Sequence, residues 1–240
     1  MTVFLTSSPC VFGADRAILN PANGFLERLG EAIPPEARCL FICSDPDSYE
    51  RTDRIGGDME QAFREAGFDF SDLVVLDHRN AWEAEAWIRW SDVIILAGGH
   101  VPTQNAFFQE IGLAELLRDY PGVIIGISAG SMNSAAVVYA QPELEGESLD
   151  PEYRRFLPGL GLTELNICPH YNLDRGYYLD GRRLYEDITY PDSFGHSFLI
   201  LVDGSYVLIR DGETQILGEA YCLEDGVLEQ IGEEGDCLTL

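Results

Sequence analysis

The sequence contains no lysine, so all fifteen of its basic residues are arginines, set against 41 aspartates and glutamates. The formal net charge is −26 at pH 7. A surface this acidic repels phosphate backbones and anionic lipid headgroups, which argues against nucleic acid or a membrane as a partner. An acidic substrate would not be steered inward by such a field, so it would need local arginines to hold it.

Long hydrophobic runs and metal-binding motifs are also missing. The first ten residues, MTVFLTSSPC, have no basic region and only a short apolar run, which excludes a signal peptide or a membrane span and predicts a cytoplasmic protein. Six cysteines occur without a C-x-x-C pair, and none of the four histidines lies in an H-E-x-x-H motif. We therefore expect buried thiols, no metal site and no organic cofactor.

Short apolar runs alternate with longer amphipathic segments along most of the chain. This alternation is typical of an α/β fold, a three-layer sandwich with a mainly parallel sheet and helices on both faces. No repeat or low-complexity linker divides the chain, so we predict one domain, residues 1–240. The predicted strands are 3–7, 38–43, 73–77, 92–98, 122–128 and 165–170, and the predicted helices are 21–32, 56–66, 81–90, 103–118 and 129–138. Short β-rich runs from residue 198 onward, separated by D-G or similar turns, predict hairpins closing one edge of the sheet.

Residues 126–130 read G-I-S-A-G, which fits the G-x-S-x-G pattern of a nucleophile elbow. In this motif the serine occupies a strained turn between a strand and a helix, and the glycines leave room for the backbone. Ligands of open α/β sheets bind at the carboxyl ends of the strands, where Ser128 is expected. Ser128 is therefore the candidate nucleophile.

A serine hydroxyl needs a base to remove its proton. His170, in NICPHYN, follows the next apolar strand after the elbow and would lie at the same edge if that strand is parallel. Asp203, in ILVDGSY, ends another apolar strand and could orient the imidazole. These two residues are the candidate base and acid.

An oxyanion formed at a substrate carbonyl needs backbone N–H donors. Ala129 directly follows the candidate nucleophile, and the glycine pair Gly98 and Gly99 can bring a second backbone N–H close to a ligand. His100 follows the pair and is a candidate for the pocket lining.

Four ordered stretches together resemble peptidase family S51, the family of aspartyl dipeptidase (peptidase E) with cyanophycinase as a more distant member. They are ILAGGHVPTQNAFFQEIGL, GVIIGISAGSMNSA, ICPHYN and LVDGSY, within residues 94–206. The resemblance implies a fold similar to class I glutamine amidotransferases and a serine peptidase that cleaves short peptides through an acyl-enzyme. It implies these roles: nucleophile Ser128, base His170, acid Asp203, and oxyanion donors Gly99 and Ala129.

The same resemblance implies a preference for an N-terminal aspartate, which needs a cation in the pocket. Arg182 and Arg183, in LDGRRLYEDI, are the candidates for substrate binding, with Arg175 a weaker one. The chain departs from aspartyl dipeptidase in having Asp203 where that enzyme has glutamate, and an alignment can also place Asp180 at the position of its arginine.

Two rival functions remain open. One is an α/β-hydrolase-like esterase that uses Ser128 with His196 and one of Asp174, Asp187 or Asp192; the other is a non-catalytic binding protein on the same fold. For the peptidase we expect a short peptide as partner and a monomer or homodimer. The acidic segment 141–153, QPELEGESLDPEY, is predicted to be a surface loop, with a lid over the pocket as the alternative.

Overall fold

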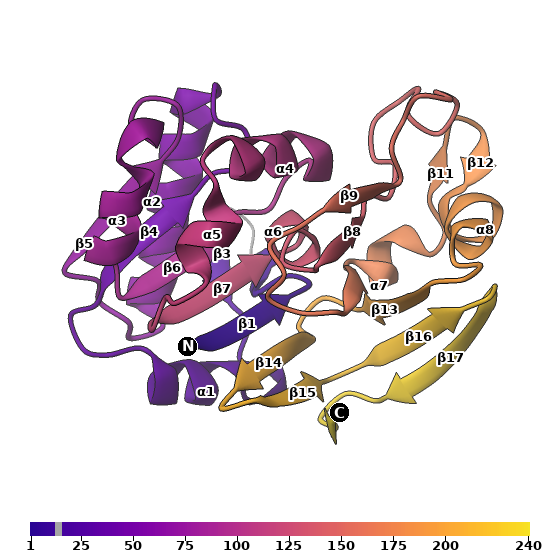
Figure 1. Cartoon of the computed structure of the whole chain (residues 1–240). Coiled ribbons are helices and arrows are strands. Elements are labelled where there is room, and N and C mark those ends of the chain that lie inside the picture. The colour runs from indigo at the N-terminus through magenta and orange to yellow at the C-terminus, as the bar shows by residue number, and fades with distance from the viewer. Residues whose placement is uncertain (13–15) are drawn as a thin grey trace.

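An eight-stranded sheet forms the centre of the computed structural model, which describes residues 1–12 and 16–240 (Figure 1). The strand order is β18-β15-β14-β1-β7-β6-β4-β5. The five strands from β1 to β5 in this order run parallel, and β14, β15 and β18 add antiparallel strands at one edge. The bounds are β1 (Thr2–Thr6), β4 (Arg38–Ile42), β5 (Asp72–Leu76), β6 (Val93–Leu96), β7 (Val123–Ile127), β14 (Tyr206–Arg210), β15 (Glu213–Leu217) and β18 (Cys237–Thr239). The sheet is mainly parallel, as predicted.

Helices pack against both faces of this sheet. Successive side chains of a strand point to opposite faces, so Ile124 joins one hydrophobic core and its neighbour Ile125 joins the other. The first core includes residues of α3 (Ala84–Trp90), α4 (Val101–Glu110) and α5 (Leu113–Leu117), and the second includes residues of α1 (Phe25–Ala32) and α2 (Tyr49–Glu65). The central strands β6 and β7 are apolar because both of their faces are buried.

Three predicted helices differ from the observed ones. The helix expected at 56–66 begins about two turns earlier, since α2 spans Tyr49–Glu65. The helix expected at 103–118 is divided into α4 and α5 at Gly112, which has a φ of 64°. The helix expected at 129–138 is wrong beyond its first turn, since α6 spans only Ala129–Met132. The β-branched and aromatic residues after it form β8 (Val137–Tyr139), which pairs with β9 (Phe156–Pro158).

A second sheet lies beside the first, with the order β10-β13-β16-β17. Its strands are β10 (Asn166–Cys168), β13 (Ser197–Leu201), β16 (Ala220–Glu224) and β17 (Val227–Gly232). The run predicted at 165–170 is a strand, but it pairs in parallel with β13 and does not join the main sheet. The β-rich runs predicted from residue 198 onward are also divided between the two sheets. The strands β14 and β15 extend the main sheet, whereas β16 and β17 belong to the second sheet. An apolar run identifies a strand without naming its partner, which is why the sequence did not separate the sheets.

Short elements complete the chain. Two further hairpins pair β2 (Cys10–Phe12) with β3 (Ala17–Leu19), and β11 (Tyr178–Leu179) with β12 (Arg182–Arg183). The remaining helical turns are η1 (Ala22–Gly24), η2 (Ala81–Glu83), α7 (Tyr171–Asp174), the π-helical η3 (Leu184–Thr189) and α8 (Tyr190–Asp192). In Figure 1 the β11–β12 hairpin and α8 stand together on the opposite side of the molecule from β4 and β5.

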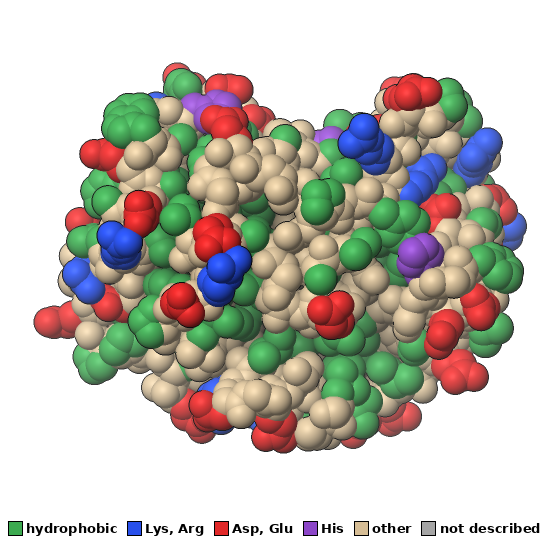
Figure 2. Space-filling model, in the orientation of Figure 1, with side chains coloured by type: hydrophobic (Ala, Val, Ile, Leu, Met, Phe, Trp, Pro, Cys, Tyr) green, Lys and Arg blue, Asp and Glu red, His purple; other side chains and the backbone are tan. Residues whose placement is uncertain are grey.

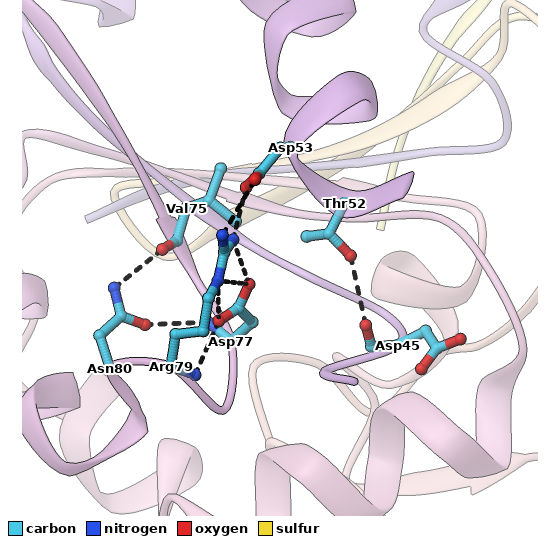
Figure 3. A network of polar contacts seen from close by, with 7 residues as sticks. All are labelled: Asp45, Thr52, Asp53, Val75, Asp77, Arg79 and Asn80. Carbon is cyan, nitrogen blue, oxygen red and sulfur yellow. Dashed lines mark hydrogen bonds and ion pairs between the residues drawn. The ribbon is translucent and has the colours of Figure 1, made fainter. Parts of the chain in front are cut away.

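A network of polar contacts holds the carboxyl ends of β4 and β5 (Figure 3). The carboxylate of the fully buried Asp77 accepts hydrogen bonds from the Arg79 backbone N–H at 2.8 Å, from Arg79 Nε at 3.0 Å to each oxygen, and from Arg79 Nη2 at 2.6 Å. The same guanidinium reaches Asp53 on α2. Asn80 accepts a hydrogen bond from the Asp77 N–H at 3.1 Å and donates one to the Val75 carbonyl at 2.9 Å. Arg79 is thus occupied by two carboxylates of the protein, and its hydrogen bond lowers the pKa of Asp53.

The outer surface reflects the composition. Figure 2 shows acidic side chains scattered over one face, mostly toward its rim, with arginines between them and mainly uncharged or hydrophobic groups over its centre. No helix in the described part of the chain combines the length and the apolar character needed to cross a membrane.

Candidate active site

Ser128 lies in the turn that joins β7 to α6. Its φ of 50° and ψ of −110° are strained for a residue with a side chain, as the elbow motif predicts. The backbone of β1 holds this turn, because the Ser128 N–H donates to the Thr6 carbonyl at 3.1 Å and Ser131 Oγ donates to the same oxygen at 2.8 Å. A Cβ on Gly130 would lie 2.3 Å from the Leu96 carbonyl oxygen, so the turn packs on β6 only with glycine there.

His170 and Asp203 meet Ser128 at this turn. His170 Nε2 lies 2.8 Å from Ser128 Oγ, and His170 Nδ1 lies 2.6 Å from Asp203 Oδ1. The two residues follow the parallel neighbours β10 and β13, so both emerge from the carboxyl edge of the second sheet. The structure therefore brings the three predicted side chains into contact. Ser128 comes from the main sheet, whereas His170 and Asp203 come from the second sheet, which the sequence analysis did not predict as a separate sheet.

Two residues that the sequence analysis missed hold the histidine and the aspartate in place. Ser7, just after β1, donates from Oγ to Asp203 Oδ1 at 2.8 Å and accepts from the His170 backbone N–H at 2.8 Å. Asn172 Oδ1 accepts from the Asp203 N–H at 2.9 Å. A signal for Ser7 was present, since β1 neighbours β7 and a polar residue that ends it lies at the same edge as Ser128.

The charges in this cluster are set by competing effects. Burial by itself lowers the pKa of His170, but the hydrogen bond and charge of Asp203, followed by the charges of Asp174 and Glu143, outweigh burial and raise it above its ordinary value. Burial raises the pKa of Asp203, yet the hydrogen bonds from His170, Ser7 and Asn172 lower it on balance. Asp203 is therefore ionised beside an imidazole of increased basicity.

Two backbone N–H groups lie beside Ser128 without a partner. In residues 1–12 and 16–240 neither the Gly99 nor the Ala129 N–H donates a hydrogen bond to a protein atom. The glycine loop contacts the elbow closely, because a Cβ on Gly98 would lie 3.5 Å from Ser128 Cβ, while a Cβ on Gly99 would lie 2.2 Å from Ser44 Oγ. Glycine at these two positions thus lets the loop backbone lie close to Ser128 and Ser44, where a larger side chain would collide with them.

A pocket of about 260 Å³ opens beside Ser128 and His170. Segment 141–153, predicted as a surface loop or a lid, contributes Gln141, Pro142 and Glu143 to the wall of this pocket. The pocket is lined, besides Ser128 and His170, by Met132, Gln141, Pro142, Glu143, Pro169, Asp174, Tyr177 and Leu184. A larger pocket of about 380 Å³ lies on the other side of Asp203, and Ser128 is not part of its lining.

The residues predicted to bind substrate lie elsewhere. Arg183 donates to both carboxylate oxygens of Asp187, at 2.6 and 3.0 Å, and Arg182 donates to the Ser148 carbonyl at 3.4 Å. His100 contacts Glu147 Oε1 at 2.7 Å through Nε2. None of these three predicted residues is in the described lining of the pocket beside Ser128. Each of them instead forms a hydrogen bond with another group of the protein.

The esterase arrangement is not assembled. The His196 ring stacks on Phe156 with 4.1 Å between ring centroids, and His170 occupies the contact with Ser128 Oγ. Asp192 is bound by Tyr139 and Arg155. In the described residues no group of three or more histidine, cysteine, aspartate or glutamate side chains is arranged to hold a metal ion.

A serine, a histidine and an aspartate in contact beside a small pocket are an arrangement that many hydrolases use. The chain belongs to peptidase family S51, whose family model matches residues 16–217, and it is therefore a peptidase. Its fold is similar to a 1.5 Å crystal structure of a protein from Listeria monocytogenes EGD-e that is provisionally described as a peptidase E. That match has a TM-score of 0.58 and 16% identity, and it covers 96% of this chain and 98% of the other. No curated protein matches the sequence.

Proposed function

We propose that this protein is a serine peptidase that hydrolyses short peptides through an acyl-enzyme. The observation that carries the proposal is the 2.8 Å contact between His170 Nε2 and Ser128 Oγ on a strained elbow, with Asp203 on the other imidazole nitrogen.

The geometry supports a two-step reaction. His170 Nε2 takes the proton of Ser128 as Oγ attacks the substrate carbonyl carbon, and the Gly99 and Ala129 N–H groups donate to the resulting oxyanion. His170 then gives its proton to the leaving amine, which departs as the ester of Ser128 forms. In the second step His170 removes a proton from water, water attacks the ester, and Ser128 is released. Asp203 keeps the Nδ1 proton on the imidazole and stabilises its charged form.

The size of the pocket supports short substrates. Its 260 Å³ is below the roughly 300–1,000 Å³ of sites for drug-sized ligands, so it accommodates about one amino-acid side chain with its backbone. The preference for an N-terminal aspartate, as the family resemblance implies, is the finer form of this proposal. It requires a cation beside Ser128, and no arginine is present in the described lining of the pocket.

Three comparisons test the proposal. The Ser128→Ala variant should lose activity on a panel of Asp-Leu, Glu-Leu, Ala-Leu and N-blocked Asp-Leu while remaining folded. His170→Ala should be inactive and His196→Ala active; the reverse result would favour the esterase. A fluorophosphonate probe should label Ser128 in the wild type, whereas a protein that only binds peptides would not react.

We further propose that the peptidase acts in the cytoplasm as a monomer or homodimer, with neither nucleic acid nor membrane as partner. The net charge of −26 supports the exclusion of these two partners. Light scattering after size-exclusion chromatography measures the oligomeric state directly.

A further inference from the structure

Two carboxylates face the pocket of Ser128 and have no role in the proposed reaction. Glu143 comes from segment 141–153, and Asp174 is the last residue of α7, the short helix that begins after His170. Apart from His170, the described lining of this pocket contains no basic side chain.

Asp174 is half-buried and Glu143 is exposed at the mouth of the pocket. Burial is the main cause that raises the pKa of Asp174 above its ordinary value, and desolvation of the Glu143 carboxyl raises its pKa to about 7. Within residues 1–12 and 16–240 neither side chain forms an ion pair. A hydrogen bond from the Val101 backbone and the charge of His170 favour the ionised form of Glu143, but desolvation outweighs them. A cation of the substrate would stabilise both ionised carboxylates further.

The backbone of Glu143 is fixed at the pocket. Glu147 Oε2 accepts hydrogen bonds from the N–H groups of Glu143 and Leu144, both at 2.9 Å. The other oxygen of Glu147 contacts His100, the residue after the oxyanion candidate Gly99. Asp174 is held in turn by its own N–H, which donates to the His170 carbonyl at 2.9 Å. The backbones of Glu143 and Asp174 are therefore held by hydrogen bonds to segments next to Gly99 and His170.

We propose, on the basis of the proposed function, that Glu143 and Asp174 make this pocket selective for a cationic amino-terminal residue, with a free α-ammonium group and a lysine or arginine side chain. Two carboxylates match the two positive charges of such a residue, and the pocket has room for one residue. An N-terminal aspartate would instead bring a third carboxylate into the same small space. This specificity is opposite to the aspartate preference that the resemblance implies.

The test is a set of kcat/KM values for Lys-Leu, Arg-Leu, Met-Leu, Asp-Leu and N-acetyl-Lys-Leu. Met-Leu is the neutral partner of Lys-Leu with a side chain of similar length. The enzymes are the wild type, Glu143→Gln, Asp174→Asn and the double variant, with Glu145→Gln as a control that removes an exposed charge of the same segment outside the pocket lining. The ratio of Lys-Leu to Met-Leu is the readout, because a change in the basicity of His170 affects both substrates equally.

The wild type should prefer Lys-Leu and Arg-Leu over Met-Leu by at least about tenfold, with Asp-Leu slowest and the acetylated peptide poorly cleaved. In the double variant the ratio of kcat/KM for Lys-Leu to kcat/KM for Met-Leu should fall by about 10- to 100-fold, as expected when charged hydrogen-bond partners are removed. The control should keep the ratio. A wild type that cleaves Met-Leu or Asp-Leu fastest, or a ratio unchanged in the double variant, overturns the inference.

Labelling by fluorophosphonate separates this failure from failure of the proposed function. If Ser128 is labelled and a neutral or acidic dipeptide is preferred, the proposed peptidase function is supported and the proposed selectivity for a cationic residue is wrong. If Ser128 is not labelled and no dipeptide of the set is cleaved, the proposed function fails, and the inference fails with it.

Discussion

Ser7 Oγ donates a 2.8 Å hydrogen bond to Asp203 Oδ1, across 196 positions of the chain. Ser7 follows β1 in the main sheet, and Asp203 follows β13 in the second sheet. The same hydroxyl accepts the backbone N–H of His170. One buried side chain therefore connects the sheet that carries Ser128 to the sheet that carries its proposed base and acid.

Ser7→Ala should weaken both activity and stability. The change leaves the His170 backbone N–H without its buried partner and removes one of the hydrogen bonds to Asp203 Oδ1, which keeps that from His170 Nδ1. An unsatisfied buried group typically costs about 1–3 kcal/mol. We expect a lower free energy of unfolding by that amount and a fall in kcat/KM of about tenfold or more, since the imidazole is less well positioned. Urea unfolding and dipeptide kinetics measure the two effects.

Ser8→Ala is the matched control for this variant. Ser8 is also buried, but among residues 1–12 and 16–240 its hydroxyl forms hydrogen bonds only with the backbone of Cys10. It should lower stability while leaving kcat nearly unchanged. Equal losses of kcat in the two variants would show that Ser7 has no special positioning role.

The acid side of the pH profile should reflect His170. Only the neutral imidazole can accept the proton of Ser128, and the pKa of His170 is raised above 6.5, so kcat/KM should fall as the pH decreases through a value above 6.5. In Asp203→Asn the lowering effect of burial is no longer outweighed by the partner carboxylate. The acid limb should then move to lower pH, and kcat should drop by roughly 10³- to 10⁴-fold. An acid limb that stays in place would contradict the proposed pairing.

Gly130→Ala should damage the elbow. The new Cβ would lie 2.3 Å from the Leu96 carbonyl oxygen, so the backbone must shift, and overpacking of this kind typically costs about 1–3 kcal/mol. Thermal unfolding and kcat/KM should fall together. Gly57→Ala is the control, since Gly57 is exposed within α2 and a Cβ there meets nothing within 4 Å. That variant should be more stable than the wild type by about 0.5–1 kcal/mol.

Glu147→Ala should raise KM more than it lowers kcat. The glutamate holds segment 141–153 through the Glu143 and Leu144 N–H groups and through His100, but it does not line the pocket. Its loss should increase the mobility of this wall of the pocket and lower its affinity for a peptide by several-fold. Steady-state kinetics separate the two parameters, and an unchanged KM would mean that the contacts do not position the segment.

The sequence predicted most of the parallel sheet and named three side chains that the structure places in contact. Ser128 could be found because its glycine spacing has a steric cause, and His170 and Asp203 could be found because each follows an apolar run at a turn. The sequence did not separate the two sheets, since the run at β10 is as apolar as the strands of the main sheet. Pairing partners depend on long-range packing that periodicity does not encode.

The proposed binding residues were less predictable. Arg182 and Arg183 were chosen for their charge alone, yet Asp187 stands four residues after Arg183 and was a visible signal that this arginine would be paired. No local pattern marked Glu143 as a pocket residue. Its position depends on how segment 141–153 returns over the elbow, which is a tertiary feature.

The most direct test is the rate of dipeptide hydrolysis by the wild type and by Ser128→Ala, with folding of both checked by circular dichroism. We predict that the best substrate of the wild type is cleaved at least about 10³-fold more slowly by the variant, as expected when an attacking serine is removed. A folded Ser128→Ala protein with unchanged turnover would contradict the proposed mechanism.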